Sequence, residues 1–393
     1  MTYKRAKIKF ALEQIIVFPF MLAGKIYGKI SPLKNKTNLF LFFPNADIGG
    51  APRVNADITG CVQDAKPLII FSKKAANNKF LHLYKLAGVQ VLDLHRLIDK
   101  KIFHFINFFY RGVIASWINQ SENPVVFGGE SLFFYKVIPH IRKDIPCMEL
   151  SHLPTWLPYN IGFIDRINQR IFSTKKLKEA VEILYRENKL AEKYFEKLSF
   201  VDNAIDIPVT NQIENKQLEV VFIGRGAPQK RVHLITAMAQ VLNGQKENIH
   251  FTIVGDVDNS INTNEYPFCN FLGNIHDENK MAEIYSASDV LILTSAFEGL
   301  PLVVMTMMAY GKPVVSTAVN AIPDYILHEI NGLLIYETSE PKIVEQGVQY
   351  LKMLHHDRKF LKSLGENSRS FAIEKFSREK FCETYRKLLL KEL

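Results

Sequence analysis

The chain has 393 residues, of which 47% are hydrophobic and 23% are charged, and this composition excludes a largely disordered protein. The length is ample for two hydrophobic cores and long for one. The formal net charge of +9 suits partners that carry phosphate, namely nucleic acid, anionic lipid or nucleotide ligands.

The first 36 residues combine a short apolar run with basic flanks. Lysines and an arginine precede residues 10–24, and four lysines follow them. Glu13 and Pro19 interrupt the run, which is too short to span a bilayer. The basic residues after it and the lack of a clear cleavage site argue against a signal peptide. Two interpretations stay open: a helix in the headgroup region of the inner membrane face, or a first helix packed on the domain.

Residues 37–206 alternate short apolar runs with longer mixed segments. The strand-like runs are 38–44, 67–72, 89–94, 124–128 and 147–150. Such alternation predicts a parallel sheet with helices on both faces, which is a Rossmann-like domain. The very aromatic segment 102–118 predicts a buried helix.

A polar stretch at 207–217 marks the predicted domain boundary. The alternation restarts within 207–376, with strand-like runs at 218–224, 249–255, 270–272, 290–294, 313–316 and 332–335. This second pattern fits one doubly wound domain. The amphipathic segment 377–393 predicts a last helix that can pack back on the first domain. Four widely separated cysteines without a CxxC pair predict reduced, packed side chains.

Two loops that follow predicted strands carry glycine and basic residues. Gly49 and Gly50 follow the first strand of the first domain, where a helix start offers free N–H groups to a phosphate. Arg225 and Lys230 follow the first strand of the second domain, and both can reach one diphosphate. A structural turn and a solvated basic loop are the alternative interpretations.

The segment from Ser295 to Gly311 is the most specific motif. Glu298, Gly299 and Leu300 join a predicted strand to a helix that Gly311 ends. The backbone N–H groups at the helix start, with the positive end of the helix dipole, suit a phosphate and sugar hydroxyls.

These motifs together resemble the retaining glycosyltransferases of family four. The resemblance rests on the order of four elements: Gly49-Gly50 with Arg53-Val54, Asn203 with Asp206, Arg225 with Lys230, and Glu298-Gly299-Leu300-Pro301. It implies the GT-B fold, α/β with two Rossmann-like domains that face each other across a cleft. It also implies that Gly50 lies near the donor phosphate, that Arg225 and Lys230 hold the diphosphate and that Glu298 contacts the donor sugar. Asn203 and Asp206 are expected to have a structural role at the end of the interdomain connection.

Two further positions, Thr306 and His152, are compared with the pattern of the family. The family has a second glutamate eight positions after the first, and here that position is Thr306, whose shorter uncharged side chain can make at most one good ribose contact. His152 follows a strand of the first domain, and the family often has a histidine at a comparable place near the transferred sugar. The triplet Asp256-Val257-Asp258 is interpreted as a polar turn and not as a metal site.

The sequence therefore predicts a metal-independent, retaining glycosyltransferase that needs no cofactor. Its donor is a nucleoside-diphosphate sugar and its acceptor a hydroxyl group, with a lipid-linked glycan as one candidate, in cell-surface polysaccharide or glycolipid synthesis. The expected location is the cytoplasm, with peripheral contact to the inner membrane face and no nucleic acid partner. The alternatives are a sugar-nucleotide epimerase on the same fold and a non-catalytic nucleotide- or sugar-binding protein.

Overall fold

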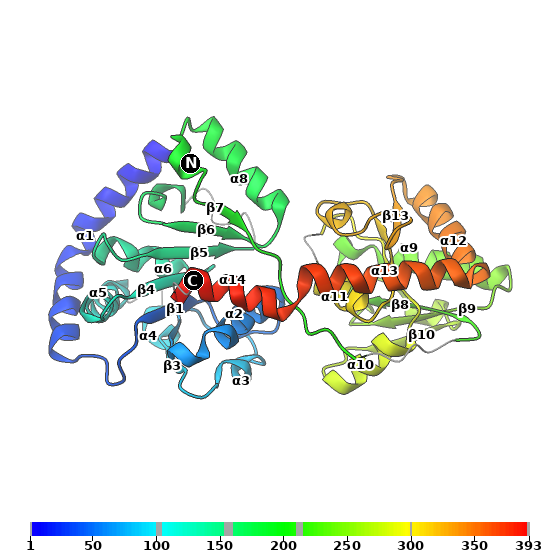
Figure 1. Ribbon diagram of the computed structural model, residues 1–393, viewed down its shortest axis with the longest axis horizontal. Helices are drawn as coiled ribbons and strands as arrows, with labels where there is room; N and C mark the ends of the chain where they lie inside the picture. The colour runs from blue at the N-terminus through cyan, green and yellow to red at the C-terminus, as the bar shows by residue number, and fades with distance from the viewer. Residues whose placement is uncertain (1, 100–103, 153–159, 210–214, 299–300, 391–393) are drawn as a thin grey trace. The chain divides into compact units, whose positions relative to one another are not determined.

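The structure is a computed structural model that describes residues 2–99, 104–152, 160–209, 215–298 and 301–390. The described chain divides into two compact units (Figure 1). Unit 1 comprises residues 1–204 and 379–393, and unit 2 comprises residues 205–378. The predicted boundary at 206/207 lies two residues from this division. Asp206 forms an ion pair with Arg378 at 2.5 Å within unit 2, so its role there is structural.

Unit 1 is built on a seven-stranded parallel sheet in the order β3-β2-β1-β4-β5-β6-β7. The strands are β1 (Leu39–Phe43), β2 (Leu68–Phe71), β3 (Gln90–Asp93), β4 (Val125–Gly129), β5 (Cys147–Ser151), β6 (Gln169–Phe172) and β7 (Leu198–Phe200). The helices are α1 (Tyr3–Ile30), α2 (Gly50–Cys61), α3 (Leu81–Tyr84), α4 (His95–Ile98), α5 (His104–Gln120), α6 (Leu132–Val137), α8 (Lys175–Glu187) and α14 (Arg378–Leu390). The five predicted strands are present, and β6 and β7 are additional to them.

The two terminal helices cover opposite faces of this sheet. Alternate residues of a strand point to opposite faces, so Phe40 and Phe42 of β1 enter one core and Leu41 enters the other. The first core includes Phe10 of α1, and the second includes Tyr385 of α14. The helix at the end of the chain therefore packs on unit 1.

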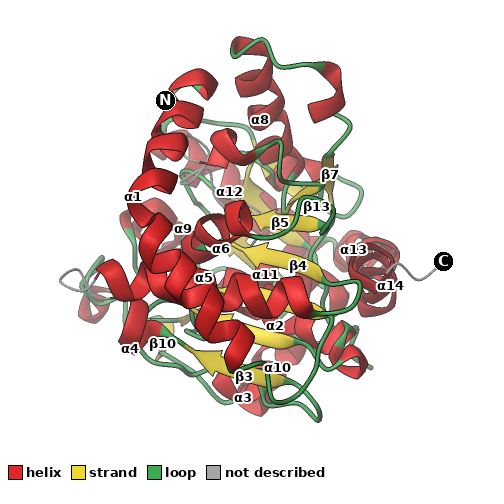
Figure 2. Cartoon of the chain, turned by 90° about the vertical axis from the view of Figure 1, so that its left-hand side faces the viewer, coloured by secondary structure: helices red, strands yellow, loops and turns green. Residues whose placement is uncertain are grey.

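Helix α1 lies along α5 (Figure 2) and packs closely on it. A Cβ atom at Gly24 would lie 1.9 Å from the Phe109 carbonyl oxygen, and one at Gly112 would lie 2.0 Å from the Met21 carbonyl oxygen. Only glycine permits these backbones to approach so closely. The packed helix, one of the two interpretations of the N-terminal segment, is observed, and the membrane contact of the other stays a prediction.

The other side of α1 is apolar and exposed. By length and composition alone, α1 could also cross a membrane, because the helix continues beyond the apolar run to Ile30. The apolar run of residues 10–24 is thus part of a longer helix. Its core-facing side is fixed by polar contacts along the helix: Lys7 pairs with Asp165 at 2.7 Å, and the Gln120 amide donates to the Gly28 carbonyl at 3.2 Å.

A disulfide corrects the prediction of reduced cysteines. Cys61 at the end of α2 is bonded to Cys382 in α14, and only Cys147 and Cys269 are free. The two partners are 321 positions apart in sequence, so no local spacing reveals them. The disulfide fastens the last helix to the helix that begins at Gly50.

Unit 2 is a six-stranded parallel sheet in the order β10-β9-β8-β11-β12-β13. Its strands are β8 (Leu218–Ile223), β9 (Ile249–Val254), β10 (Cys269–Gly273), β11 (Val290–Leu293), β12 (Val314–Thr317) and β13 (Gly332–Ile335). The helices are α9 (Val232–Gly244), α10 (Glu278–Ala287), α11 (Leu302–Ala309), α12 (Glu340–His356) and α13 (Arg358–Phe376). All six predicted strands are present within a residue or two.

Candidate active site

The strand order of unit 2 places its candidate site. The chain order reverses between β8 and β11, which are neighbours in the sheet. At such a switch point the loops after the two strands diverge and leave a crevice at their carboxyl ends. The loop after β8 carries Arg225 and Lys230, and the loop after β11 carries Glu298. The motifs predicted from sequence therefore meet at the point where open α/β sheets bind ligands.

Lys230 and Glu298 form a shielded ion pair. The Lys230 ammonium contacts the Glu298 carboxylate, and their side chains are only 15% and 7% exposed. The Ser295 hydroxyl donates to the same carboxylate oxygen at 2.6 Å, and the Glu298 N–H donates to the Asn320 side chain at 3.3 Å. The prediction assigned Lys230 to a diphosphate, whereas in the structure its partner is Glu298.

Arg231 links the loop after β8 to the loop after β11. Its guanidinium donates to the carbonyl oxygens of Thr294 at 2.6 Å and Ser295 at 2.9 Å. Its backbone has φ +47°, which lets the chain turn directly from the short helix 228–230 into α9. Arg231, Ser295 and Asn320 were not predicted as site residues. A second basic residue beside Lys230 was the only sequence signal for Arg231.

Other donor-binding residues predicted in unit 2 include Arg225, Gly299 and Leu300. Arg225 is exposed, and no ion-pair partner is found for it among the described residues. Its guanidinium is therefore available to a ligand. Gly299 and Leu300 lie outside the described residues.

Thr306 lies on α11 with its hydroxyl already used. The hydroxyl donates to the Leu302 carbonyl oxygen at 2.9 Å, one turn earlier in the helix. Tyr285 and Tyr310 stack nearby, with ring centroids 5.3 Å apart, and a hydrogen bond links Tyr285 to Thr306. Burial raises the pKa of Tyr285 to about 12, so its hydroxyl stays protonated. Thr306 thus belongs to a local network, and its predicted ribose contact is untested.

Gly49 and Gly50 belong to unit 1. Gly49 precedes α2, and a Cβ atom at Gly50 would meet no heavy atom within 4 Å. The space beside Gly50 is open. The loop is fixed by Asp47, whose carboxylate accepts N–H groups of Ala76 at 3.0 Å and Asn77 at 2.8 Å. Since the two glycines and the unit 2 motifs lie in different units, their predicted shared role is untested.

His152 follows β5 in unit 1 and is held through its backbone. Its N–H donates to the Glu130 carboxylate at 2.7 Å. The ring Nε2 is shielded from solvent and has no hydrogen-bond partner in the described part of the chain. Burial lowers the pKa of His152 to about 4, so the ring is neutral at pH 7. A neutral imidazole can donate and accept hydrogen bonds, so it can contact sugar hydroxyls, and the predicted place of His152 near the transferred sugar is untested.

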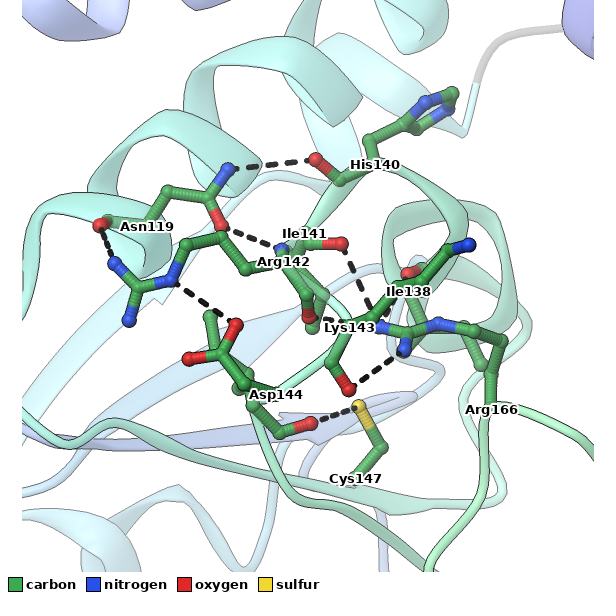
Figure 3. Close-up of polar contacts among 10 residues, drawn as sticks. Asn119, Ile138, His140, Ile141, Arg142, Lys143, Asp144, Cys147 and Arg166 are labelled. Carbon is green, nitrogen blue, oxygen red and sulfur yellow. Dashed lines mark hydrogen bonds and ion pairs between the residues drawn. The ribbon is translucent and has the colours of Figure 1, made fainter.

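Arg166 holds the segment that precedes β5 (Figure 3). Its guanidinium donates to the carbonyl oxygens of Arg142 at 3.0 Å and Lys143 at 3.2 Å. Arg142 in turn donates to the Asn119 carbonyl at 2.7 Å. These contacts fix the turn that leads into Cys147, the first residue of β5. Hydrogen bonds thus fix the backbone before β5 and, through Glu130, at His152 directly after it.

One side-chain group in the described residues has the spacing of metal ligands. Ligand atoms of Glu247, His355 and His356 lie within 4.8 Å of one another. Glu247 already pairs with Lys352 at 2.9 Å and with His356 at 3.3 Å. The group lies at the ends of α9 and α12, away from the carboxyl ends of β8 and β11.

Comparisons with solved structures first identify the fold. The structure of Anabaena HepE, solved with UDP and glucose, matches 91% of this chain and all of its own with a TM-score of 0.70 at 15% identity. The pneumococcal O-GlcNAc transferase GtfA, solved with UDP and GlcNAc, matches 91% of this chain and 99% of its own, again with a TM-score of 0.70, at 13% identity. The predicted fold, two Rossmann-like α/β domains of the GT-B type, is confirmed.

Sequence comparisons then match part of the chain to glycosyltransferases. Residues 217–353 match the family model described as Glycosyl transferases group 1. An uncharacterized glycosyltransferase of Methanocaldococcus jannaschii is 26% identical over 171 residues, 42% of this chain and 43% of its own. The N-acetyl-alpha-D-glucosaminyl L-malate synthase of Bacillus anthracis is 32% identical over 115 residues, 29% of this chain and 28% of its own. The chain spans less than half the length of these curated relatives. The predicted resemblance to glycosyltransferases is confirmed, and the assignment to family four stays a prediction.

Proposed function

We propose that the protein transfers a sugar from a nucleoside-diphosphate sugar to a hydroxyl acceptor. The observation that carries this proposal is the convergence of Lys230, Glu298 and Arg225 on the switch point of unit 2. The match to Glycosyl transferases group 1 covers the same unit. Because HepE and GtfA were solved with UDP, uracil is the first base to test.

The chemistry follows from the charges. Breaking the sugar–phosphate bond leaves negative charge on the diphosphate, and preorganised cations at that place lower the barrier. Arg225 is exposed and can take a phosphate oxygen through two parallel N–H donors. Lys230 would turn from Glu298 to the diphosphate, and the released carboxylate would accept donor-sugar hydroxyls. We propose that the reaction needs no metal, because these two cations supply the positive charge, and that it retains configuration, as the resemblance to family four implies.

The experiment is a calorimetric titration with UDP and UDP-sugars, followed by a transfer assay. Arg225→Ala should weaken UDP binding roughly 10-fold or more, since one charged hydrogen bond is lost. Lys280→Ala, an exposed cation on α10, is the control and should bind UDP normally. Turnover unchanged by chelator and an α-linked product from an α-linked donor support the metal-independent, retaining reaction. Equal UDP affinity in wild type and Arg225→Ala would remove the assignment of this loop.

A non-catalytic binding protein is the second candidate, because the Thr306 hydroxyl already donates a hydrogen bond to the Leu302 carbonyl oxygen. It predicts UDP binding without donor hydrolysis or transfer. An epimerase would interconvert two UDP-sugars without any acceptor. The same assay separates all three.

We further propose a cytoplasmic location with peripheral contact to the membrane, in the synthesis of a cell-surface glycan. The support is the outer stripe of α1: Ile15, Phe18, Leu22 and Ile26 recur at helical spacing and are all exposed. Removing residues 1–37 is a poor test, since Phe10 would leave the core. Ile15→Glu should instead reduce flotation with anionic vesicles, while Ile183→Glu, an exposed position on α8, should not.

A further inference from the structure

Unit 1 contains a cavity of about 980 Å³ at its own switch point. The strand order reverses between β1 and β4. Pro44, which follows β1, and Glu130, which follows β4, both line the cavity. Helix α1 forms one wall, as do α5 and the start of α6. The helix that is added before the first strand therefore encloses the place where an open α/β sheet binds ligands.

One face of α1 lines this cavity. Arg5, Ile8, Lys9, Leu12 and Ile16 line it at spacings of three and four residues. The buried Val17 and the ion-paired Glu13 also line the cavity, whereas Phe10 of the core and the outer stripe defined above do not. With Phe108 of α5 opposite, the wall is mainly aliphatic and aromatic.

The charges along the cavity are mainly positive. Five cationic and three acidic side chains line it. One acid, Glu13, is held between Arg111 at 2.8 Å and Lys136 at 2.6 Å. Burial tends to raise the pKa of Glu13, but hydrogen bonds and charges from Lys136 and Arg111 lower it overall, so Glu13 remains ionised.

Three cations remain for a ligand. Arg5, Lys9 and Lys73 are exposed, and no ion-pair partner for their side chains is found among the described residues. Of the acids, Asp99 accepts the Lys74 N–H at 2.9 Å, and Glu130 accepts the His152 N–H at 2.7 Å. An apolar surface beside cations that have no ion-pair partner is complementary to an alkyl chain that ends in an anionic group such as phosphate.

We propose that this cavity binds a membrane lipid that carries a phosphate head group. The chain lies against Leu12, Ile16 and Phe108, and the phosphate lies among the three exposed cations. The outer stripe of α1 adjoins the cavity face on the same helix, so a lipid can enter from the membrane surface on which that stripe is proposed to lie. The site does not depend on the transferase activity, and binding can be measured without a sugar donor.

The test uses the full chain and decyl phosphate below its micelle concentration, in a calorimetric titration. Leu12→Glu places a charge in the apolar wall and should weaken decyl phosphate binding at least 10-fold. The control is Ile26→Glu, on the outer stripe of the same helix. The two side chains are 58% and 54% exposed, so both variants should fold. Ile26→Glu should leave decyl phosphate binding unchanged while it weakens vesicle flotation.

The head group is tested by a second pair. Lys9→Gln should weaken decyl phosphate binding about 10-fold, and Lys29→Gln, an exposed lysine of α1 outside the cavity, should not. Equal binding of inorganic phosphate and decyl phosphate would overturn the proposal in favour of a simple anion site. Equal losses in Leu12→Glu and Ile26→Glu, or no binding by the wild type, would overturn it as well.

Discussion

The ion pair between Lys230 and Glu298 allows the sharpest prediction, because its two halves should respond in opposite ways. Lys230→Met leaves the Glu298 carboxylate, only 7% exposed, with the Ser295 hydroxyl as its remaining side-chain partner. Leaving a shielded charge without its partner costs about 3 kcal/mol of unfolding free energy. Glu298→Gln costs less, about 1 kcal/mol, because the amide oxygen still accepts from Ser295 and Lys230 still reaches water.

The double variant isolates the pair itself. With both charges removed no unpaired group remains, so the double variant should be more stable than the sum of the single losses predicts. The coupling free energy should be about 1.5–3 kcal/mol, the range for a hydrogen bond between charged groups. Urea denaturation of the four proteins, followed by circular dichroism, measures it. A coupling below about 0.5 kcal/mol would mean that the pair is a surface contact of the ordinary kind.

UDP binding by the same single variants of Lys230 and Glu298 gives a second measurement. Lys230→Met should weaken UDP binding about 10-fold, since a cation facing the diphosphate is lost. Glu298→Gln should bind UDP as well as the wild type or better, because Lys230 no longer has to leave a carboxylate. Its transfer rate should fall nevertheless, since the contact to the donor sugar is weakened. If Glu298→Gln weakens UDP binding as much as Lys230→Met, the assignment of separate roles is refuted.

Three further predictions address other parts of the molecule. Thr306→Glu should strengthen UDP binding about 10-fold by adding a ribose acceptor, whereas Thr306→Val should not change it, because the hydroxyl is already bonded to Leu302; calorimetry decides. Gly24→Ala should destabilise the fold by about 1–3 kcal/mol, since its Cβ would meet the Phe109 carbonyl at 1.9 Å, while Gly244→Ala, with open space around it, should be neutral in the same urea titration. Burial lowers the pKa of His140 from 6.5 to about 4, so the unfolded chain binds the extra proton between these values. The free energy of unfolding should therefore fall by up to about 3 kcal/mol as the pH drops from 6.5 to 4, and His140→Asn should lose that part of the slope.

The sequence predicted the strands of unit 2 well, because each is an unbroken apolar run between polar segments. It missed β6 in unit 1 for a physical reason. Arg170 stands inside that short strand, and a charged residue argues against a buried strand. In the structure Arg170 is 2% exposed and contacts Glu149, which lies directly opposite on β5. A pairing between positions 21 residues apart becomes visible only when the strands are placed side by side.

The candidate site was predicted as residues but not as contacts. Arg225, Lys230 and Glu298 were each recognised because they follow strands. The contact between Lys230 and Glu298 depends on β8 and β11 being neighbours, which is a property of the sheet order. The close approach of α1 to α5 was missed for a similar reason. Gly24 and Gly28 lie one turn apart in α1, but their meaning depends on the helix that lies against them.

The switch points of the two units differ in what surrounds them. In unit 2 the described part of the crevice between β8 and β11 is lined by a shielded ion pair and an exposed arginine, and charged groups of this kind suit a diphosphate. In unit 1 the crevice between β1 and β4 is walled by α1 and α5, so apolar side chains face it. The same parallel-sheet topology thus offers one polar and one amphiphilic site. The difference is made by α1, whose residues 5–17 wall the cavity of unit 1.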